Sequence, residues 1–286
     1  MQLFDTSNVD LSGQVAIVTG GGRGLGRAMA QALSAAKAKV AVTARTESQL
    51  AETVDLIQNS GGDVLAIPAD ITDRKAVEKM VQTVQQELGA IDLLVNNAGV
   101  VGTPGPIWEA DPDDWQHTLD VNLYSAFLCS ATVLKAMIER HQGRIINVAS
   151  GAAMGPITYG SQYCVSKAAL LRLTECIADD AKAYGISAFA IDPGSVRTAM
   201  TAYLIESTEG QTYLPWYREL ILAGGDVPAE LSASLVTVLA SGKADCLSGR
   251  FIRVTDNLDH LILQAEQIEK HELYTLRINA LPLETT

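Results

Sequence analysis

The sequence predicts one α/β domain, a three-layer α/β/α arrangement in which helices cover both faces of a doubly wound parallel sheet. Short apolar runs alternate with longer segments of helical period, as in repeated βαβ units. The runs are continuously apolar rather than alternating, which indicates strands covered on both faces. A glycine-rich stretch at 19–26 joins the first run to the first helical segment, a position typical of a phosphate-binding turn.

The six apolar runs give the expected strands, which lie at 15–19, 39–44, 64–69, 91–96, 144–150 and 186–192. The helices between them have recognisable start signals. Thr46 with Gln49 fits a capping box. Asp73 can cap the next helix, and Asp111 followed by Pro112 opens a long one through residue 140. Each helix would form a right-handed crossover between parallel strands.

Beyond residue 192 the alternation weakens. Residues 195–226 mix aromatic and aliphatic side chains with small and polar ones. We identify a substrate loop there, either a lid over an apolar pocket or a surface loop with its own small core. Residues 1–257 are assigned to the domain and 258–286 to a C-terminal extension. The extension begins with helical period and is expected to pack on the domain or on a neighbouring subunit.

Composition limits the classes of partner and location. The net charge of -12 disfavours nucleic acid and anionic membrane surfaces, because the long-range field has the wrong sign. The amino terminus lacks the features of a secretory signal, and no apolar run approaches membrane-spanning length, so we expect a cytoplasmic protein. The cysteines and histidines show no metal-ligand spacing. We expect no metal site, and reduced, mostly buried thiols.

The glycine-rich stretch at 19–26 can cradle phosphate groups. Gly20, Gly24 and Gly26 let the backbone turn sharply and approach a pyrophosphate. The following helix would present unpaired amides to that pyrophosphate. A glycine-rich loop is weak evidence by itself, but its place between the first strand and the first helix strengthens it. We therefore expect a dinucleotide cofactor here.

Charge at the end of the second strand distinguishes the two nicotinamide dinucleotides. NAD is held there by a carboxylate that binds the ribose hydroxyls, and residues 42–46 contain no acid. Arg45, together with Arg23 in the glycine loop, could clasp a ribose 2′-phosphate. Two solvated surface arginines are the alternative interpretation. We predict a preference for NADP(H) over NAD(H).

Tyr163 and Lys167 lie four residues apart at the start of a predicted helix, so their side chains rise from one face. A free tyrosine has a pKa of about 10, and nearby positive charge stabilises its phenolate. Lowering that pKa by about three units needs about 4 kcal/mol, which an ammonium and an oxidised nicotinamide in a dry pocket can supply. Ser150, at the end of the fifth predicted strand, could donate to the substrate oxygen while Tyr163 supplies the proton.

These landmarks resemble the short-chain dehydrogenase/reductase family, from about Leu11 to about Val254. The resemblance implies a Rossmann fold and a one-domain, NADP-preferring type. The matching motifs, in chain order, are TGGGRGLG (19–26), Asp70–Ile71, Asn96–Gly99, Trp115, Asn122, Ser150, Tyr163, Lys167 and Pro193–Thr198.

The resemblance also implies a role for each of these residues. Tyr163 would be the general acid/base, Lys167 would hold the nicotinamide ribose and tune Tyr163, and Ser150 would orient the substrate oxygen. Asn122 would hold a water that links Lys167 to solvent. Together with the glycine loop and the two arginines, the expected cofactor-binding residues are Gly20, Arg23, Gly24, Leu25, Gly26, Arg45, Asp70, Ile71, Asn97, Ala98, Gly99, Tyr163, Lys167, Pro193, Gly194, Val196 and Thr198.

The predicted function is transfer of a hydride between NADP(H) and a small carbonyl or secondary alcohol substrate. Ala152 and Tyr159 are candidates for the substrate pocket, although Tyr159 could equally close a loop. The alternatives are an epimerase or dehydratase that uses the same tetrad, a non-catalytic NADP-binding sensor or scaffold, and a methyltransferase, which gives no reason for the tetrad. The resemblance further implies a homo-oligomer, a tetramer or dimer, with the helices around 112–140 and 161–184 as contact surfaces.

Overall fold

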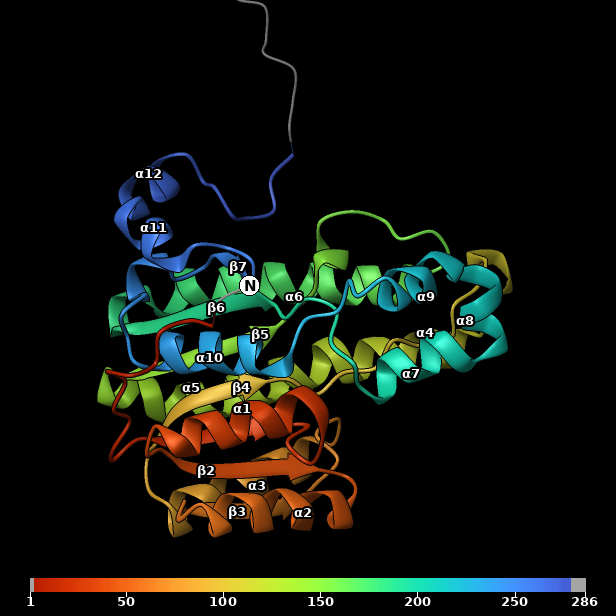
Figure 1. The fold of residues 1–286 in the computed structure, drawn as a ribbon. Helices are drawn as coiled ribbons and strands as arrows, with labels where there is room; N and C mark the ends of the chain where they lie inside the picture. The colour runs from red at the N-terminus through yellow and green to blue at the C-terminus, as the bar shows by residue number, and fades with distance from the viewer. Residues whose placement is uncertain (1–2, 279–286) are drawn as a thin grey trace, which may run out of the picture.

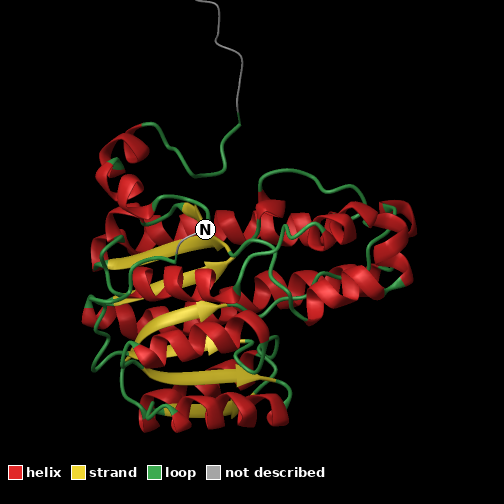
Figure 2. Ribbon diagram, viewed as in Figure 1, coloured by secondary structure: helices red, strands yellow, loops and turns green. Residues whose placement is uncertain are grey.

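Seven parallel strands form one sheet, in the order β3-β2-β1-β4-β5-β6-β7. The computed structural model describes residues 3–278, and Figures 1 and 2 show helices on both faces of the sheet. The strands are β1 (Val15–Thr19), β2 (Lys39–Ala44), β3 (Val64–Pro68), β4 (Ile91–Asn96), β5 (Gly143–Val148), β6 (Ile186–Asp192) and β7 (Phe251–Arg253). The predicted doubly wound, three-layer domain is confirmed, with all six predicted strands present and the short β7 added at one edge.

Each face of the sheet has its own hydrophobic core, because successive strand residues point to opposite faces. Ala16 and Val18 of β1 belong to one core and Val15 and Ile17 to the other. The first core includes side chains from α1 (Gly24–Ala35), α2 (Glu47–Asn59) and α10 (Ala229–Ala240), and the second from α3 (Arg74–Glu87), α5 (Ser125–Arg140) and α6 (Ser161–Ala181). A fully buried valine, leucine or isoleucine contributes about 1.5–3 kcal/mol, so these two cores hold the strand ends that carry the site.

The order of the strands reverses at β1, which pairs with both β2 and β4. The crossovers from these two neighbours run in opposite directions, so the loops that follow β1 and β4 diverge and leave a crevice at the carboxyl ends of the strands. Thr19, the last residue of β1, fixes the crevice. Its Oγ1 accepts from the amide of Asn97 at 3.0 Å and from the amide of Ala98 at 3.1 Å. The glycine loop and the segment after β4 therefore lie side by side.

The long helix predicted beyond Asp111 is interrupted. α4 (Pro112–Leu119) is followed by a π-helical turn, η2 (Asp120–Tyr124), before α5 begins. Asp111 caps α4 with its side chain, as predicted. A π turn inserts one extra residue per turn and occurs most often at functional sites. This one contains Asn122, which the sequence places in the candidate site.

Two further start signals have opposite outcomes. Asp73 accepts a hydrogen bond from the Lys75 amide at 2.8 Å, so the predicted cap of α3 is confirmed. Thr46 occupies the N-cap position of α2, but its side chain makes no capping hydrogen bond. The predicted capping box is wrong because Thr46 and Gln49 both line a cavity instead.

The helical stretch Pro112–Arg140, made up of α4, the π turn and α5, is long and apolar enough by composition to span a membrane, contrary to the expectation from the sequence. In the structure, 44% of its apolar window is buried. Leu128, Cys129 and Val133 of this stretch belong to the core that includes α3 and α6. Its apolar side is therefore packed against the sheet of this domain.

Residues 195–226 form three short helices rather than a loop. These are α7 (Ala199–Glu206), α8 (Thr208–Tyr213) and α9 (Pro215–Leu222). Ser207 caps α8 through its hydroxyl, and Pro215 begins α9 at the first helical position, where the missing N–H is no loss. Leu204, Leu214 and Ile221 are buried. The segment thus has apolar side chains of its own to hold it in place.

The chain continues past β7 into two more helices, α11 (Leu258–Leu263) and α12 (Ala265–Lys270). Leu258, Leu261 and Ile268 join the core that includes α1 and α10. The Phe251 amide of β7 donates to the Tyr274 carbonyl at 2.8 Å. The described part of the expected extension therefore contacts its own domain, whereas 279–286, like residues 1–2 of the expected domain, fall outside the described residues. The remaining short helical turns are η1 (Ile107–Glu109), η3 (Gly151–Ala153), η4 (Lys182–Tyr184) and η5 (Asp245–Leu247).

The thiols are less buried than expected. Cys129 is buried and Cys164 half-buried, but Cys176 and Cys246 are exposed. The expectation of mostly buried thiols is wrong because the latter two lie on outward-facing positions of α6 and η5. Across residues 3–278, no group of three histidine, cysteine, aspartate or glutamate side chains could hold a metal ion.

Candidate active site

Two adjoining cavities open at the carboxyl ends of the strands. The first, of about 280 Å³, lies beside the glycine loop and is called here the glycine-loop cavity. The second, of about 370 Å³, contains Tyr163 and is called the tyrosine cavity. The residues common to both walls are Leu25, Asn97, Gly99, Thr198 and Met200. A molecule that fills the first cavity can therefore reach into the second.

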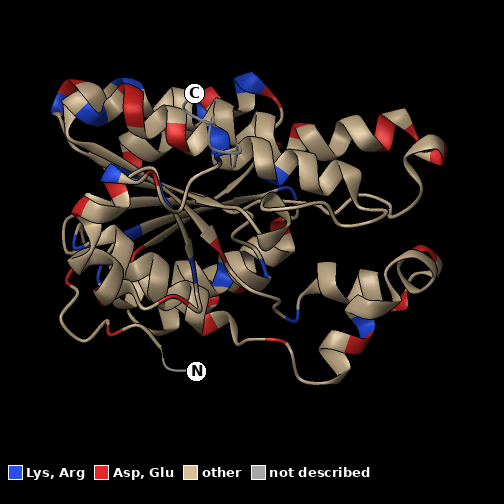
Figure 3. Cartoon of the chain, turned by 90° about the horizontal axis from the view of Figure 1, so that it is seen from above, with Lys and Arg blue, Asp and Glu red and all other residues tan. Residues whose placement is uncertain are grey.

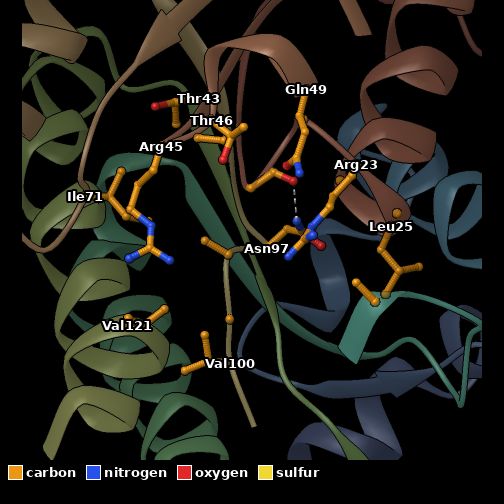
Figure 4. Close-up of a pocket in the computed structure, with 18 of the residues that line it drawn as sticks. Arg23, Leu25, Thr43, Arg45, Thr46, Gln49, Ile71, Asn97, Val100 and Val121 are labelled. Atoms are coloured by element: carbon orange, nitrogen blue, oxygen red, sulfur yellow. Dashed lines mark hydrogen bonds between the residues drawn. The ribbon is translucent and has the colours of Figure 1, made fainter. Parts of the chain in front are cut away.

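Close packing of glycines shapes the glycine-loop cavity. Gly20 and Gly24 have φ values of +65° and +54°, in the left-handed region that favours glycine. A Cβ on Gly26 would lie 2.3 Å from the Gly20 carbonyl oxygen, so α1 sits directly against the loop. Asn97 Nδ2 donates to the same oxygen at 3.4 Å (Figure 4). Arg23, the N-cap residue, and the first helical residues Gly24, Leu25 and Gly26 line this cavity, so the N-terminus of α1 faces it.

Two arginines project into this cavity. Figure 4 shows Arg23 and Arg45 reaching into it from opposite sides. Neither guanidinium forms an ion pair within the described part of the chain, whereas the neighbouring Arg27 pairs with Glu52 at 2.7 Å. Thr43, also in the wall, has a buried Oγ1 for which the described residues offer no hydrogen-bond partner. Positive charge in the cavity and a buried, unpartnered hydroxyl thus lie near the end of β2.

Asp70 and Ile71 form the wall of the glycine-loop cavity beyond β3. The Thr72 hydroxyl and amide donate to Asp70 Oδ1 at 2.7 Å and 3.0 Å. These hydrogen bonds lower the pKa of Asp70, because they stabilise its charged form. The carboxylate is therefore held in one orientation at the edge of the cavity.

Three predicted catalytic side chains meet in the tyrosine cavity. Tyr163 and Lys167 come from the first two turns of α6, and the Lys167 Nζ lies 5.7 Å from the centroid of the Tyr163 ring. Ser150 follows the end of β5 by two residues, and its Oγ accepts from the Ala152 amide at 3.2 Å. Ser150 and Tyr163 both line this cavity. The fold thus brings residues from β5 and α6 to one place.

Burial sets the proton affinities of this group. It raises the pKa of Tyr163 to about 12, and it lowers the pKa of Lys167 to about 8. The lowering of the phenol pKa was expected from Lys167 together with an oxidised nicotinamide; in the chain alone burial dominates and raises it. The Lys167 ammonium donates to the Val148 carbonyl at 2.8 Å. At neutral pH the phenol keeps its proton, so it is a proton donor.

Asn122 lies behind the cavities rather than in their walls. Its side chain accepts from the Val100 amide at 2.8 Å and donates to the Val100 carbonyl at 2.8 Å. It also donates to the Ser166 hydroxyl at 2.9 Å. A Cβ on Gly99 would lie 3.2 Å from Asn122 Oδ1 and 3.6 Å from Lys167 Nζ. Asn122 therefore fastens the segment after β4 to α6, next to the lysine.

All of the predicted cofactor-binding residues line one or both cavities, and Ala152 lines the tyrosine cavity. Asn122 and Tyr159 are not in either wall. The Tyr159 ring lies 5.1 Å from the ring of Tyr213, and its carbonyl accepts from the Gly105 amide at 2.9 Å, so it closes a loop.

The sequence reasoning missed Asp192, which also lines the tyrosine cavity. It left open whether Trp216 and Tyr217 cover a pocket or lie in a surface loop, and both line the cavity. A signal for Asp192 was available, since it is a carboxylate at the carboxyl end of a buried strand. The two aromatic residues lie in the segment 195–226, where the periodicity gave no way to tell wall from surface.

Comparisons with a family profile, with curated proteins and with solved structures all find short-chain dehydrogenases. The family profile described as short chain dehydrogenase matches residues 14–209. A short chain dehydrogenase of Pseudocercospora fijiensis is 33% identical over 95% of this chain and 91% of its own length. A 3-oxoacyl-[acyl-carrier-protein] reductase of Synechocystis is 36% identical over 68% of this chain and 78% of its own. The crystal structure of a putative short-chain alcohol dehydrogenase from Sinorhizobium meliloti has a TM-score of 0.78 and 34% identity, over 86% of this chain and 96% of that one.

Proposed function

The chain belongs to the short chain dehydrogenase family, and from that premise we propose that it is an NADP(H)-dependent oxidoreductase that interconverts a carbonyl compound and a secondary alcohol. The observation that carries the proposal is the meeting of Ser150, Tyr163 and Lys167 in a cavity that adjoins the glycine-loop cavity. A hydride donor and a proton donor can act on one carbonyl only if both reach it from a shared space.

The proposed chemistry divides among four side chains. Tyr163 donates its phenol proton to the substrate oxygen during reduction and takes it back during oxidation. Ser150 donates a hydrogen bond to the same oxygen and holds it beside the phenol. Lys167 holds the nicotinamide ribose, and its charge favours the phenolate when the alcohol is oxidised. Asn122 holds a water that links Lys167 to solvent. When bound, the nicotinamide supplies or accepts the hydride.

The glycine-loop cavity fits a dinucleotide. The amides at the start of α1 suit a pyrophosphate, and a Cβ on Gly26 would fill the contact that shapes the loop. The buried, unpartnered Oγ1 of Thr43 also suits a polar ligand at the end of β2. Arg23 and Arg45 favour a 2′-phosphate on the ribose, because a charge-assisted hydrogen bond to a guanidinium is about twice as strong as a neutral one.

The preference is tested with Arg45→Ala. We expect NADPH to bind wild type more tightly than NADH, and the variant to lose about tenfold or more of its NADPH affinity with little change for NADH. Lys79→Ala, at an exposed position on α3, is the matched control and should bind both nucleotides as wild type does. Equal affinity of wild type for the two nucleotides, or tighter NADH, contradicts the preference.

The catalytic role is tested with Tyr163→Phe, which keeps the ring and removes the proton. We expect unchanged NADPH binding and at least a thousandfold loss of kcat with any carbonyl substrate found by monitoring NADPH oxidation, in line with removal of a general acid. Binding without turnover in wild type as well would favour a sensor or scaffold. Full activity of the variant would refute the role assigned to Tyr163.

We also propose a cytoplasmic homo-oligomer, a dimer or tetramer. Support comes from apolar side chains on outward faces of α5 and α6: Phe127 is 48% exposed and Val165 is 46% exposed. Tyr124 stacks on Phe127 with 6.3 Å between ring centroids. A patch of this kind is common at subunit contacts. Size-exclusion chromatography with light scattering measures the assembly, and a monomer at micromolar concentration contradicts it.

A further inference from the structure

The walls of the tyrosine cavity are mostly aliphatic and aromatic. Trp216 and Tyr217 at the start of α9 both face it, with their rings edge to face and 5.5 Å between centroids. Further apolar wall residues are Val101, Pro104, Ile157, Met200, Leu204 and Leu214. Aromatic walls pack best against flat ring systems. The nicotinamide would occupy part of the volume of about 370 Å³, so the chemistry of the walls, and not the volume, indicates the class of substrate.

The wall of the tyrosine cavity contains one cationic and one anionic side chain. Lys167 is the only cation among the lining residues; the residue is 3% exposed, and its ammonium donates to a carbonyl. Asp192 is the only carboxylate. A substrate acid or phosphate would therefore find no free counter-charge, and it would stand near a carboxylate. Removing such an anion from water without a partner is costly.

Asp192 is fixed at the crossing of two loops. Its Oδ1 accepts from the Gly194 amide at 3.1 Å, and its Oδ2 lies close to Gly151, where a Cβ would be 3.2 Å from it. Gly151 directly follows Ser150, so Asp192 stands beside the group that orients the substrate oxygen. A carboxylate offers about four acceptor positions. The one backbone donor, Gly194, leaves it able to accept from a hydroxyl of a bound molecule.

The segments that flank the cavity are acidic. Residues 107–120 follow the wall residues Val101 and Pro104, and residues 199–222 contribute the opposite wall. Their carboxylates are Glu109, Asp111, Asp113, Asp114, Asp120, Glu206, Glu209 and Glu219, with Arg218 as the single lysine or arginine. Figure 3 shows these elements on the right, with more red than blue. This excess of negative charge in the two segments repels an acidic carrier protein during encounter.

We propose that the tyrosine cavity takes a neutral ring-bearing ketone with a hydroxyl group, that the hydroxyl donates to Asp192, and that the substrate arrives free in solution. This inference rests on the proposed function and narrows it. It separates this chain from the relatives named as acyl-carrier-protein reductases, whose substrate, by those names, is joined to a carrier protein.

The experiment compares matched ketones under NADPH oxidation. The probes are 1-tetralone, its 5-, 6- and 7-hydroxy derivatives, a carboxylated 1-tetralone, and acetoacetyl-acyl-carrier protein. For wild type we expect at least one hydroxy isomer to exceed 1-tetralone about tenfold in kcat/KM, which corresponds to one charge-assisted hydrogen bond. We expect the carboxylated ketone and the carrier thioester to be the poorest substrates.

The variant Asp192→Asn tests the charge itself. If the substitution merely disturbed the loops, kcat/KM would fall for all the ketones alike. Loss of the negative charge instead raises kcat/KM for the carboxylated ketone relative to the others. We therefore expect the ratio of carboxylated to parent ketone to rise about tenfold in the variant, and the advantage of the best hydroxy isomer to shrink. Asp192→Glu, which keeps the charge, should keep the low ratio.

The outcomes separate the two proposals. The substrate class is overturned if the carrier thioester is the best substrate, if the hydroxyl gives no advantage in any isomer, or if NADPH binds and none of the ketones is reduced. It is also overturned if Asp192→Asn leaves the ratio of carboxylated to parent ketone unchanged. Failure of NADPH to bind, or full activity of Tyr163→Phe, instead overturns the proposed function and the inference that rests on it.

Discussion

Replacing Gly26 with alanine should damage the cofactor site through a single added carbon. The new Cβ would lie 2.3 Å from the Gly20 carbonyl oxygen, 2.8 Å from its carbonyl carbon and 2.5 Å from Asn97 Nδ2. Real Cβ contacts are never this short, and two of the three atoms are backbone that cannot rotate away. The loop must therefore move off α1, and the hydrogen bond from Asn97 must lengthen.

The size of the effect follows from two opposing contributions. Alanine is favoured over glycine inside a helix by up to about 1 kcal/mol, and Gly26 lies in the first turn of α1. Overpacking costs about 1–3 kcal/mol. We expect a net loss of about 1–2 kcal/mol in the free energy of unfolding, and, at about 2–4 °C per kcal/mol for a large domain, a decrease in Tm of a few degrees. Nucleotide affinity should fall by about tenfold or more, since the displaced backbone is what approaches the phosphates.

Thermal unfolding and nucleotide titration by fluorescence measure the two effects. Gly155→Ala is the matched control, because nothing lies within 4 Å of a Cβ at that position and its φ is not in the left-handed region. It should unfold and bind nucleotide as wild type does. If Gly26→Ala also behaves like wild type in both assays, the close contact between α1 and the glycine loop is not what shapes the site.

Two further predictions concern buried charges. Lys167→Met removes an ammonium whose pKa burial lowers from 10.5 to about 8. Between these values the unfolded chain holds a proton that the folded chain has released, so wild type should gain stability over the variant as the pH rises from 8 to 10.5. Urea unfolding at several pH values measures this, and parallel pH dependences would contradict it. Asp92→Ala removes the acceptor for the Val15 amide and for Arg140, each at 3.0 Å. Asp92→Ala should lower the free energy of unfolding, measured in urea, by about 3–5 kcal/mol. The control Asp55→Ala, on an exposed face of α2, should show no significant loss. A small loss for Asp92→Ala would show that the pair with Arg140 does not stabilise the fold.

The strands could be predicted from the sequence because the signal is local. A run such as VAIVT at 15–19 is covered on both faces, so it is apolar at every position, and β1 has the predicted bounds. Asp73 and Asp111 could likewise be recognised, since a capping side chain bonds to amides two residues away. Thr46 has the same local pattern but faces a cavity, and a tertiary neighbour of this kind leaves no trace in a five-residue window.

The candidate site divides in the same way. Tyr163 and Lys167 could be paired from their spacing on one helix, and the glycine loop from its place after a strand. The π turn at Asn122 could not, because a single inserted residue changes the helix without changing its apolar period. Nor could the direction of the pKa of Tyr163, which depends on how much water the assembled walls exclude.

What the sequence by itself determined is the alternation of strands and helices, the chemical groups available, and the family. These properties depend on residues near one another in the chain. Only the tertiary structure decided that the segment 195–226 forms three helices that line the tyrosine cavity, and that Asp192 is the carboxylate in that cavity. It also decided that Arg23 and Arg45 face one cavity without ion-pair partners in the described chain. Packing of the whole sheet determines which distant segments lie close together, so this proximity cannot be predicted from the sequence of either segment alone.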